Sequence, residues 1–374
     1  MVADDFLLEA GGPEYRSALM AFFVLCAVSG APLSWNKTAG GDTVSWVGFE
    51  LLLRSHKLGI SQRRAEWFTR WAREVAQAGH VNISTFEEGL GRVMYVAGAL
   101  EYERPFLAPL YKFMSLHPRG SVRKVPAYVS FFLAHLSRQI EENRHHSCAT
   151  EQRSSAVSPR VDAQASESRT GLGGWLPVLD ENGAPDPWRS PWFSIEVTEE
   201  EWPWVYEKGG RPALIISTLE ALAVLISLRL FFGGTASQHR SKIMVAPTWT
   251  DNRGNGSALN KLMSTKFPAS AVLMELATYT KKMGMKVLVE WTPRAGNREA
   301  DALANGDSSL FDPRRRVQLE SDVQWEVLDQ ALRRGREAES ETATARAEKR
   351  LPDRASKRMK KRKPTEKLRV TDPW

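Results

Sequence analysis

The chain has 374 residues, of which 42% are hydrophobic and 25% are charged. This length and composition are those of a soluble globular protein with two or three folded domains, and nothing in them requires disorder throughout the chain. Its two cysteines, Cys26 and Cys148, exclude a disulfide framework and form no CxxC pair for structural zinc. A reducing intracellular compartment, cytoplasm or nucleus, is therefore the simpler expectation.

The net charge of +7 is concentrated at the carboxyl end, where residues 331–374 hold 15 lysines or arginines against 7 acidic residues. The segment RASKRMKKRKPTEKLR at 354–369 lacks the apolar periodicity that a core requires. We predict that 311–374 is a basic, largely disordered tail that binds nucleic acid or directs nuclear import, with a merely solubilising role as the alternative. Its densest basic run is Lys360, Lys361, Arg362 and Lys363.

Two apolar stretches, 17–36 and 213–232, are long enough to raise the question of a membrane span. A glycine and a proline interrupt the first stretch, and the residues before it are acidic, unlike the basic flank of a signal peptide. The second stretch carries Glu220 and Arg229, which suits a core helix better. We expect no membrane partner.

The amino-terminal half predicts a helix near residues 13–27 and a strand or hairpin at 42–53, where β-branched and aromatic residues lie between glycines. Helical patterns follow at 62–79, 84–100, 104–116 and 126–143. They indicate a small helical bundle attached to a β-containing domain. Residues 146–158 are polar and lose this periodicity, which predicts a linker.

The second half predicts three strands in succession, followed by alternating helices and strands. The strands are expected at 160–166, 172–180, 191–198, 241–250 and 286–292, and the helices at 212–232, 255–264, 268–283 and 297–305. This order is typical of a mixed sheet with helices on its faces, an α/β fold.

Four acids in this half have small or apolar neighbours. Asp162 lies in the first strand, Glu220 in the long helix, Asp251 at the end of strand 241–250, and Asp301 in the last helix. Any one alone, such as an aspartate near a helix N-terminus, is most simply a surface residue. Four converging carboxylates would repel one another unless cations neutralised them. Oxygen-rich sites of this kind suit magnesium or manganese.

In order, spacing and context, these four acids resemble those of the ribonuclease H domain in reverse transcriptases of gypsy-like and DIRS-like retroelements. PRAGNREADALAN at 293–305 is similar to that family's Pro-x-x-x-Asn-x-x-Ala-Asp-Ala-Leu pattern. The resemblance covers 159–310 and implies a mixed five-stranded sheet with flanking helices. It also implies that the acids Asp162, Glu220, Asp251 and Asp301 bind two Mg²⁺ or Mn²⁺ ions and hydrolyse the RNA strand of RNA/DNA hybrids.

Two further features bear on this activity. Asn252 and Asn255 offer side chains for nucleic-acid binding, and GLGGW at 171–175 offers backbone amides, although structural turns are the simpler interpretation of the glycines. Many cellular ribonucleases H have a histidine on the loop before the last aspartate. TPRAGNREAD at 292–301 has none, which lowers the expected turnover without changing the reaction.

The first 145 residues resemble the end of a reverse-transcriptase polymerase. Residues 1–60 are similar to part of the palm, with the remnant polymerase site at Asp4, Asp5 and Lys37, and 61–145 are similar to the thumb and connection. Neither a third metal-binding aspartate nor fingers precede this segment. The resemblance therefore implies an incomplete polymerase, with other parts of a retroelement polyprotein as partners.

Two alternatives remain. The first alternative to a ribonuclease H is an inactive remnant that binds nucleic acid. The second is a nuclease of the same fold that acts on DNA, such as an integrase or a Holliday junction resolvase. The complete set of four acids disfavours the first alternative. The resemblance of the upstream segment to a palm and thumb disfavours the second.

Overall fold

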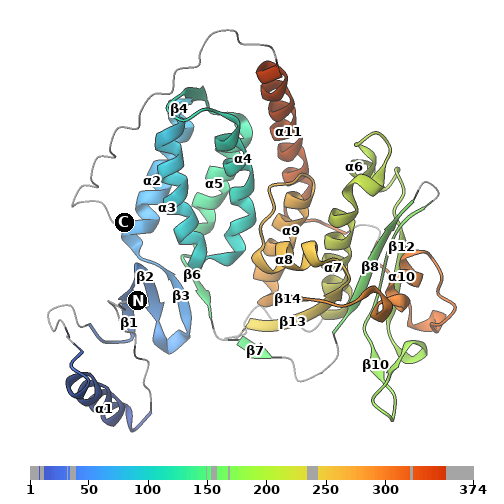
Figure 1. Cartoon of the computed structure of the whole chain (residues 1–374), viewed down its shortest axis with the longest axis horizontal. Helices are drawn as coiled ribbons and strands as arrows, with labels where there is room; N and C mark the ends of the chain where they lie inside the picture. The colour runs from blue at the N-terminus through green and yellow to red at the C-terminus, as the bar shows by residue number, and fades with distance from the viewer. Residues whose placement is uncertain are drawn as a thin grey trace.

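The structure is a computed structural model that describes residues 8, 12–31, 33, 39–148, 150–152, 158–166, 169–233, 243–320 and 323–350. The predicted polymerase residues Asp4, Asp5 and Lys37, and the basic run at 360–363, lie outside the described residues. A helical half and an α/β half lie side by side, with helix α11 between them (Figure 1). Buried apolar residues of both halves form one continuous core.

A short helix, α1 (Tyr15–Val28), precedes the first sheet, whose strand order is β1-β2-β3-β6. The strands are β1 (Thr43–Trp46), β2 (Phe49–Leu52), β3 (Lys57–Ile60) and β6 (His145–Ser147). The hairpin predicted at 42–53 is confirmed, because Trp46 pairs with Phe49 across a two-residue turn. Both turn residues, Val47 and Gly48, have positive φ, as hairpin turns that match the strand twist require.

The four predicted helices of the bundle are confirmed. They are α2 (Gln62–Ala78), α3 (Ile83–Ala99), α4 (Ala108–Leu116), which the 3-10 segment η3 (Glu101–Leu107) precedes, and α5 (Ala127–Glu142). Phe68, Phe86, Phe113 and Phe132 are fully buried between them. A two-stranded ribbon of β4 (His80–Asn82) and β5 (Val122–Lys124) closes one end.

The segment predicted as a linker, 146–158, contributes strands instead. β6 completes the first sheet, and β7 (Thr150–Gln152) pairs in parallel with β13 of the second sheet. Edge strands need only backbone hydrogen bonds, so a polar segment without apolar periodicity still forms them. The two halves also make direct contact, since the buried Glu103 of η3 accepts a hydrogen bond from Lys281 Nζ at 2.7 Å.

The second sheet confirms the predicted mixed arrangement of five strands, in the order β12-β9-β8-β13-β14, with β7 as an addition beside β13. The strands β8, β9 and β12 are antiparallel neighbours, whereas β13 pairs in parallel with β8 and β14. Their bounds are β8 (Arg160–Ala165), β9 (Thr170–Trp175), β12 (Trp192–Glu196), β13 (Ile243–Thr250) and β14 (Met285–Trp291). The loop between β9 and β12 holds the ribbon β10 (Val178–Leu179) and β11 (Pro185–Asp186), and the 3-10 turn η4 (Pro187–Arg189).

The helices predicted to flank this sheet are also present. They are α7 (Ile216–Phe232), α8 (Arg253–Lys261), α9 (Ala269–Met283) and α10 (Arg298–Ala304), with the shorter α6 (Pro203–Tyr206), η5 (Pro212–Ile215) and η6 (Arg294–Gly296) between strands and helices. Residues 212–232 are long and apolar enough to cross a membrane, but 67% of that window is buried within the protein. α7 packs against β8, β9 and α9. The prediction that this segment is a core helix is therefore confirmed.

The prediction of a disordered tail from 311 onward is wrong for the described part of that segment. Phe311 is buried beside Trp175 and Trp192, and η7 (Pro313–Arg315) follows it. Helix α11 (Leu328–Arg350) then packs against α4, α5 and α9. The prediction failed because α11 is highly charged and buries mainly small side chains, so its sequence shows little apolar periodicity. The buried residues are Leu328, Ala331, Leu332, Ala338 and Thr342.

Candidate metal centre

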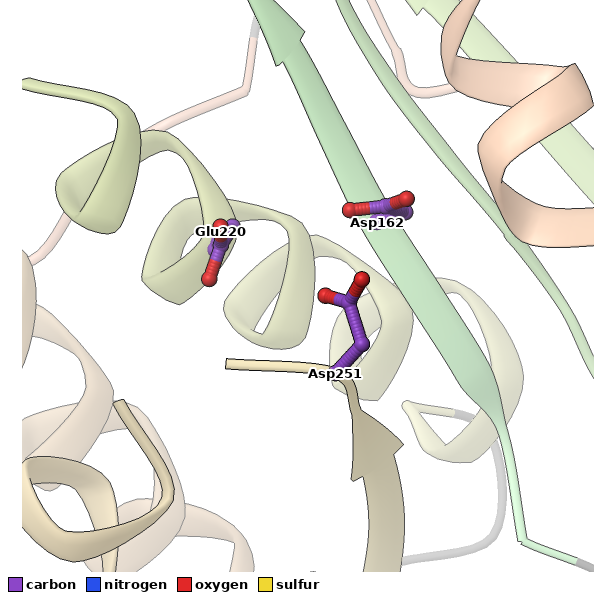
Figure 2. Close-up of side chains that lie close together, drawn as sticks. All are labelled: Asp162, Glu220 and Asp251. Carbon is purple, nitrogen blue, oxygen red and sulfur yellow. The ribbon is translucent and has the colours of Figure 1, made fainter. Parts of the chain in front are cut away.

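Three of the four predicted acids meet in space, each from a different element. Asp162 lies in β8, Glu220 lies in α7, and Asp251 directly follows β13 (Figure 2). One carboxylate oxygen from each lies within 4.8 Å of those of the other two. Asp162 and Glu220 are buried and Asp251 is half-buried. The chain therefore concentrates three carboxylates, 89 residues apart at most in sequence (162 to 251), in one largely desolvated space.

Asp162 is the most strongly perturbed of these acids. Burial and then the neighbouring charge of Asp251 raise the pKa of Asp162 to about 7, with smaller contributions from Asp301 and Glu220. A hydrogen bond from the backbone N–H of Ala163, at 2.8 Å, lowers the pKa in part. The carboxyl of Asp162 thus holds its proton to a higher pH than an exposed aspartate does when no cation is close by.

Glu220 has a similar environment, and burial followed by the charge of Asp251 raises its pKa to about 7. Hydrogen bonds from Asn252 and Asn255 oppose this rise. Asn255 is buried, and its Nδ2 donates to Glu220 Oε2 at 2.9 Å and to the carbonyl of Ser217 at 2.7 Å. The Oδ1 of Asn252 caps α8 by accepting from the N–H groups of Gly254 and Asn255.

These contacts change the interpretation of the two asparagines. Both were predicted to bind nucleic acid. Asn255 has the donors of its Nδ2 occupied inside the protein and fixes the orientation of Glu220 instead. Asn252 caps α8 with its Oδ1, and nucleic-acid binding by this residue stays a prediction. The asparagine at the third position of α8, just after an acidic strand end, is the sequence signal for this role.

Asp301, the fourth acid, lies at the edge of the cluster. It is in α10 with its side chain 34% exposed, and its Oδ1 accepts from Arg294 Nη2 at 3.0 Å. It does not belong to the group of three within 4.8 Å, but its charge contributes to the raised pKa of Asp162. The structure thus gives three clustered acids and a fourth acid that is paired with an arginine.

The glycines of β9 let α10 approach the sheet closely. A Cβ at Gly173 would lie 2.6 Å from the backbone carbon of Leu303, and one at Gly171 would meet the backbone of Ala304. Asn297, which is buried at the start of α10, donates from Nδ2 to the carbonyl of Val161 at 2.9 Å. The glycines are therefore structural, but the predicted turn is wrong, because they lie within strand β9. Together these contacts hold Asp301 near Asp162.

Replacing Gly173 by alanine should displace α10, because the new Cβ meets helix backbone that has no flexible side chain to move aside. We expect the free energy of unfolding to fall by about 1–3 kcal/mol, as overpacking of a close contact does. Urea denaturation measures this loss. Gly91→Ala is the control, because a Cβ at Gly91 meets no atom within 4 Å, and it should not lower the free energy of unfolding. A Gly173→Ala protein as stable as the wild type would contradict the close packing of α10.

The acidic cluster also predicts how the stability of metal-free protein depends on pH. Burial raises the pKa of Asp162 and Glu220 to about 7, above the value of about 4 for unfolded carboxyls. Between these values the folded chain binds more protons than the unfolded chain, so its stability falls as pH rises from about 4 to 7. Thermal unfolding in EDTA should show that the melting temperature of Asp162→Asn falls less between about pH 4 and 7 than that of the wild type. Equal pH dependence in both proteins would contradict the raised pKa.

The donor set suits a hard divalent cation. It consists of carboxylate oxygens, without a sulfur or imidazole ligand among the described residues within the cluster. Two of these carboxyls would give up protons to a cation, which makes the expected affinity increase with pH. Magnesium and manganese prefer such oxygen ligands, so the residues fit the predicted metal.

A mixed five-stranded sheet with buried acids at strand and helix positions defines a candidate metal centre. No model of a known protein family matches the chain, and no curated protein is significantly similar in sequence. Solved structures that resemble it include RNase H1 from the halophilic archaeon Halobacterium salinarum NRC-1, at 16% identity and a TM-score of 0.28. That match covers 42% of this chain and 98% of the other.

A second similar structure is the N-terminal RNase H domain of a Mycobacterium tuberculosis protein, determined as a fusion with maltose-binding protein. It has 16% identity and a TM-score of 0.26, over 41% of this chain and 95% of the other. At these values the similarities establish no activity for this chain.

Proposed function

We propose that the chain is a metal-dependent nuclease that hydrolyses the RNA strand of RNA/DNA hybrids. The observation that carries this proposal is the buried cluster of Asp162, Glu220 and Asp251 within 4.8 Å. Unpaired carboxylates in a desolvated site are costly, and a chain that keeps three of them together gains from a bound cation. Their placement on the first strand, the long helix and the end of the fourth main strand agrees with the resemblance found in the sequence.

Asp162, Glu220 and Asp251 would hold the cations, and Asp301 would complete the set. Divalent cations bound there supply activation of the attacking water and stabilisation of the leaving 3′ oxygen. The residues of the chain position the ligands: Asn255 fixes Glu220, and Asn297 fixes the start of the helix that carries Asp301. Selectivity for RNA would come from contacts with the 2′-hydroxyl in the shallow groove of the hybrid.

We also propose, from the sequence resemblance, that the chain derives from a retroelement polyprotein. The order of hairpin, helical bundle and acidic α/β domain supports this origin. The basic segment 354–369 adds a means of attracting nucleic acid, because each phosphate contact releases condensed counterions. An inactive nucleic-acid-binding remnant is the main competing function.

The experiment compares substrates at equal concentration in Mg²⁺: an RNA/DNA hybrid, single-stranded RNA, duplex DNA and a four-way DNA junction. A primer–template with deoxynucleotides is included. We expect cleavage of the RNA in the hybrid and no primer extension. Cleavage of duplex DNA or of the junction would instead favour an integrase or a resolvase. Binding of the hybrid without cleavage would favour the inactive remnant.

A further inference from the structure

Arg294 lies at the entrance of the acidic cluster, in the 3-10 turn η6 between β14 and α10. Its Nη2 donates to Asp301 Oδ1 at 3.0 Å, while the arginine side chain remains 75% exposed. The turn itself is anchored, because Arg160 Nη1 donates to the carbonyl of Gly296 at 3.3 Å. A long, exposed side chain thus extends from a fixed backbone position toward the acids.

The charge of Arg294 acts on more than its direct partner. The hydrogen bond and charge of Asp301 raise the pKa of Arg294, and the charges of Asp251 and Asp162 raise it further. Three of the four acids therefore attract this guanidinium. A cation in this place disfavours a second cation nearby, since like charges repel across a few ångströms of partly desolvated protein.

We propose that Arg294 is the resident counter-ion of Asp301, which competes with the divalent metal and turns to a substrate phosphate when the metal is bound. The inference rests on the proposed function. Pairing with Asp301 neutralises a carboxylate that would otherwise repel the other three acids. Once a metal takes that role, the exposed guanidinium is released, and its planar fork of N–H donors matches a phosphate in two parallel hydrogen bonds. Arg294 then acts as a positioning residue for the substrate phosphate.

The test measures Mn²⁺ binding by calorimetry, without nucleic acid, to wild-type protein and to Arg294→Ala and Arg294→Lys. Removing the competing charge should lower the Mn²⁺ dissociation constant about two- to fivefold, the range of an exposed ion pair. Arg294→Lys keeps the charge and should remain near the wild type. Arg298→Ala, at an exposed arginine four residues further on, is the matched control and should bind Mn²⁺ as the wild type does.

The second measurement is hybrid cleavage at saturating Mn²⁺, where Arg294→Ala should raise KM and Arg294→Lys should restore part of the difference. Unchanged or weaker Mn²⁺ binding by Arg294→Ala would overturn the inference, even if the wild type cleaves the hybrid. If the wild type neither binds Mn²⁺ nor cleaves the hybrid, both the proposed function and the inference about Arg294 fail. Circular dichroism spectra of the variants that match the wild type confirm that folding is unaffected.

Discussion

Replacing Asp251 by asparagine is expected to reduce the cleavage of hybrid RNA by about 1,000-fold or more. Even a residue that only orients a metal ligand contributes roughly 10- to 100-fold, and Asp251 is itself one of the three clustered acids. Asparagine has nearly the same shape, so the fold should persist. Single-turnover cleavage rates of the wild type and the variant in Mg²⁺ measure this reduction. Circular dichroism spectra first confirm that both proteins are folded.

The same substitution should leave the metal-free protein folded, and should make its stability less dependent on pH. The charge of Asp251 raises the pKa of both Asp162 and Glu220, and asparagine removes that charge. Glu199→Gln, at an exposed acid in the loop after β12, provides the control and should cleave at the wild-type rate. An Asp251→Asn protein that cleaves within tenfold of the wild type would show that the cluster is not the reaction centre.

The second large effect concerns Glu275, whose side chain is completely buried in α9. Its carboxylate accepts a hydrogen bond from Arg229 Nη2 at 2.7 Å and from the backbone N–H groups that precede and begin α11. Those groups belong to Glu326, Val327 and Leu328, at 3.0, 2.7 and 3.0 Å. This one side chain therefore both neutralises a half-buried arginine and caps the start of α11.

Glu275→Ala should lower the free energy of unfolding by about 3–5 kcal/mol, because breaking a buried pair leaves the remaining charge uncompensated. The three backbone donors also lose their acceptor, which should loosen α11 from α4, α5 and α9. Chemical denaturation measures the first effect, and limited proteolysis near residue 328 measures the second.

Two variants control for this prediction. Glu275→Gln retains acceptor geometry but not charge, and should fall between alanine and the wild type. Lys282→Gln removes an exposed ion pair with Glu326 and should cost less than about 1 kcal/mol. If Glu275→Ala is no more destabilised than Lys282→Gln, Glu275 does not anchor α11.

Most of the regular structure follows from local patterns in the sequence. Apolar periodicity marked the four bundle helices, and a continuous apolar run marked the core helix α7. Alternation or short apolar runs marked the five main strands. β7 escaped prediction because it forms by backbone pairing with β13, which leaves no trace in side-chain pattern. α11 escaped because its stability comes from distant partners, notably Glu275 of α9.

The candidate site was predictable at the level of residue type and less so at the level of contacts. Asp162, Glu220 and Asp251 stood out because acids rarely occupy apolar strands and helices, and they do lie together. The spacing between such acids carries no information on hydrogen-bond partners. The role of Asn255 in holding Glu220, and the ion pair of Arg294 with Asp301, became visible only once the elements were packed.

The most direct test of the proposed function is strand-specific cleavage by the purified 374-residue chain. An RNA/DNA hybrid with a separate label on each strand is incubated with Mg²⁺, beside EDTA and Asp251→Asn controls, and the product ends are identified. We expect the RNA strand alone to be cut, with 5′-phosphate and 3′-hydroxyl ends, and no product in either control. An intact RNA strand, or equal cleavage by Asp251→Asn, would contradict the account.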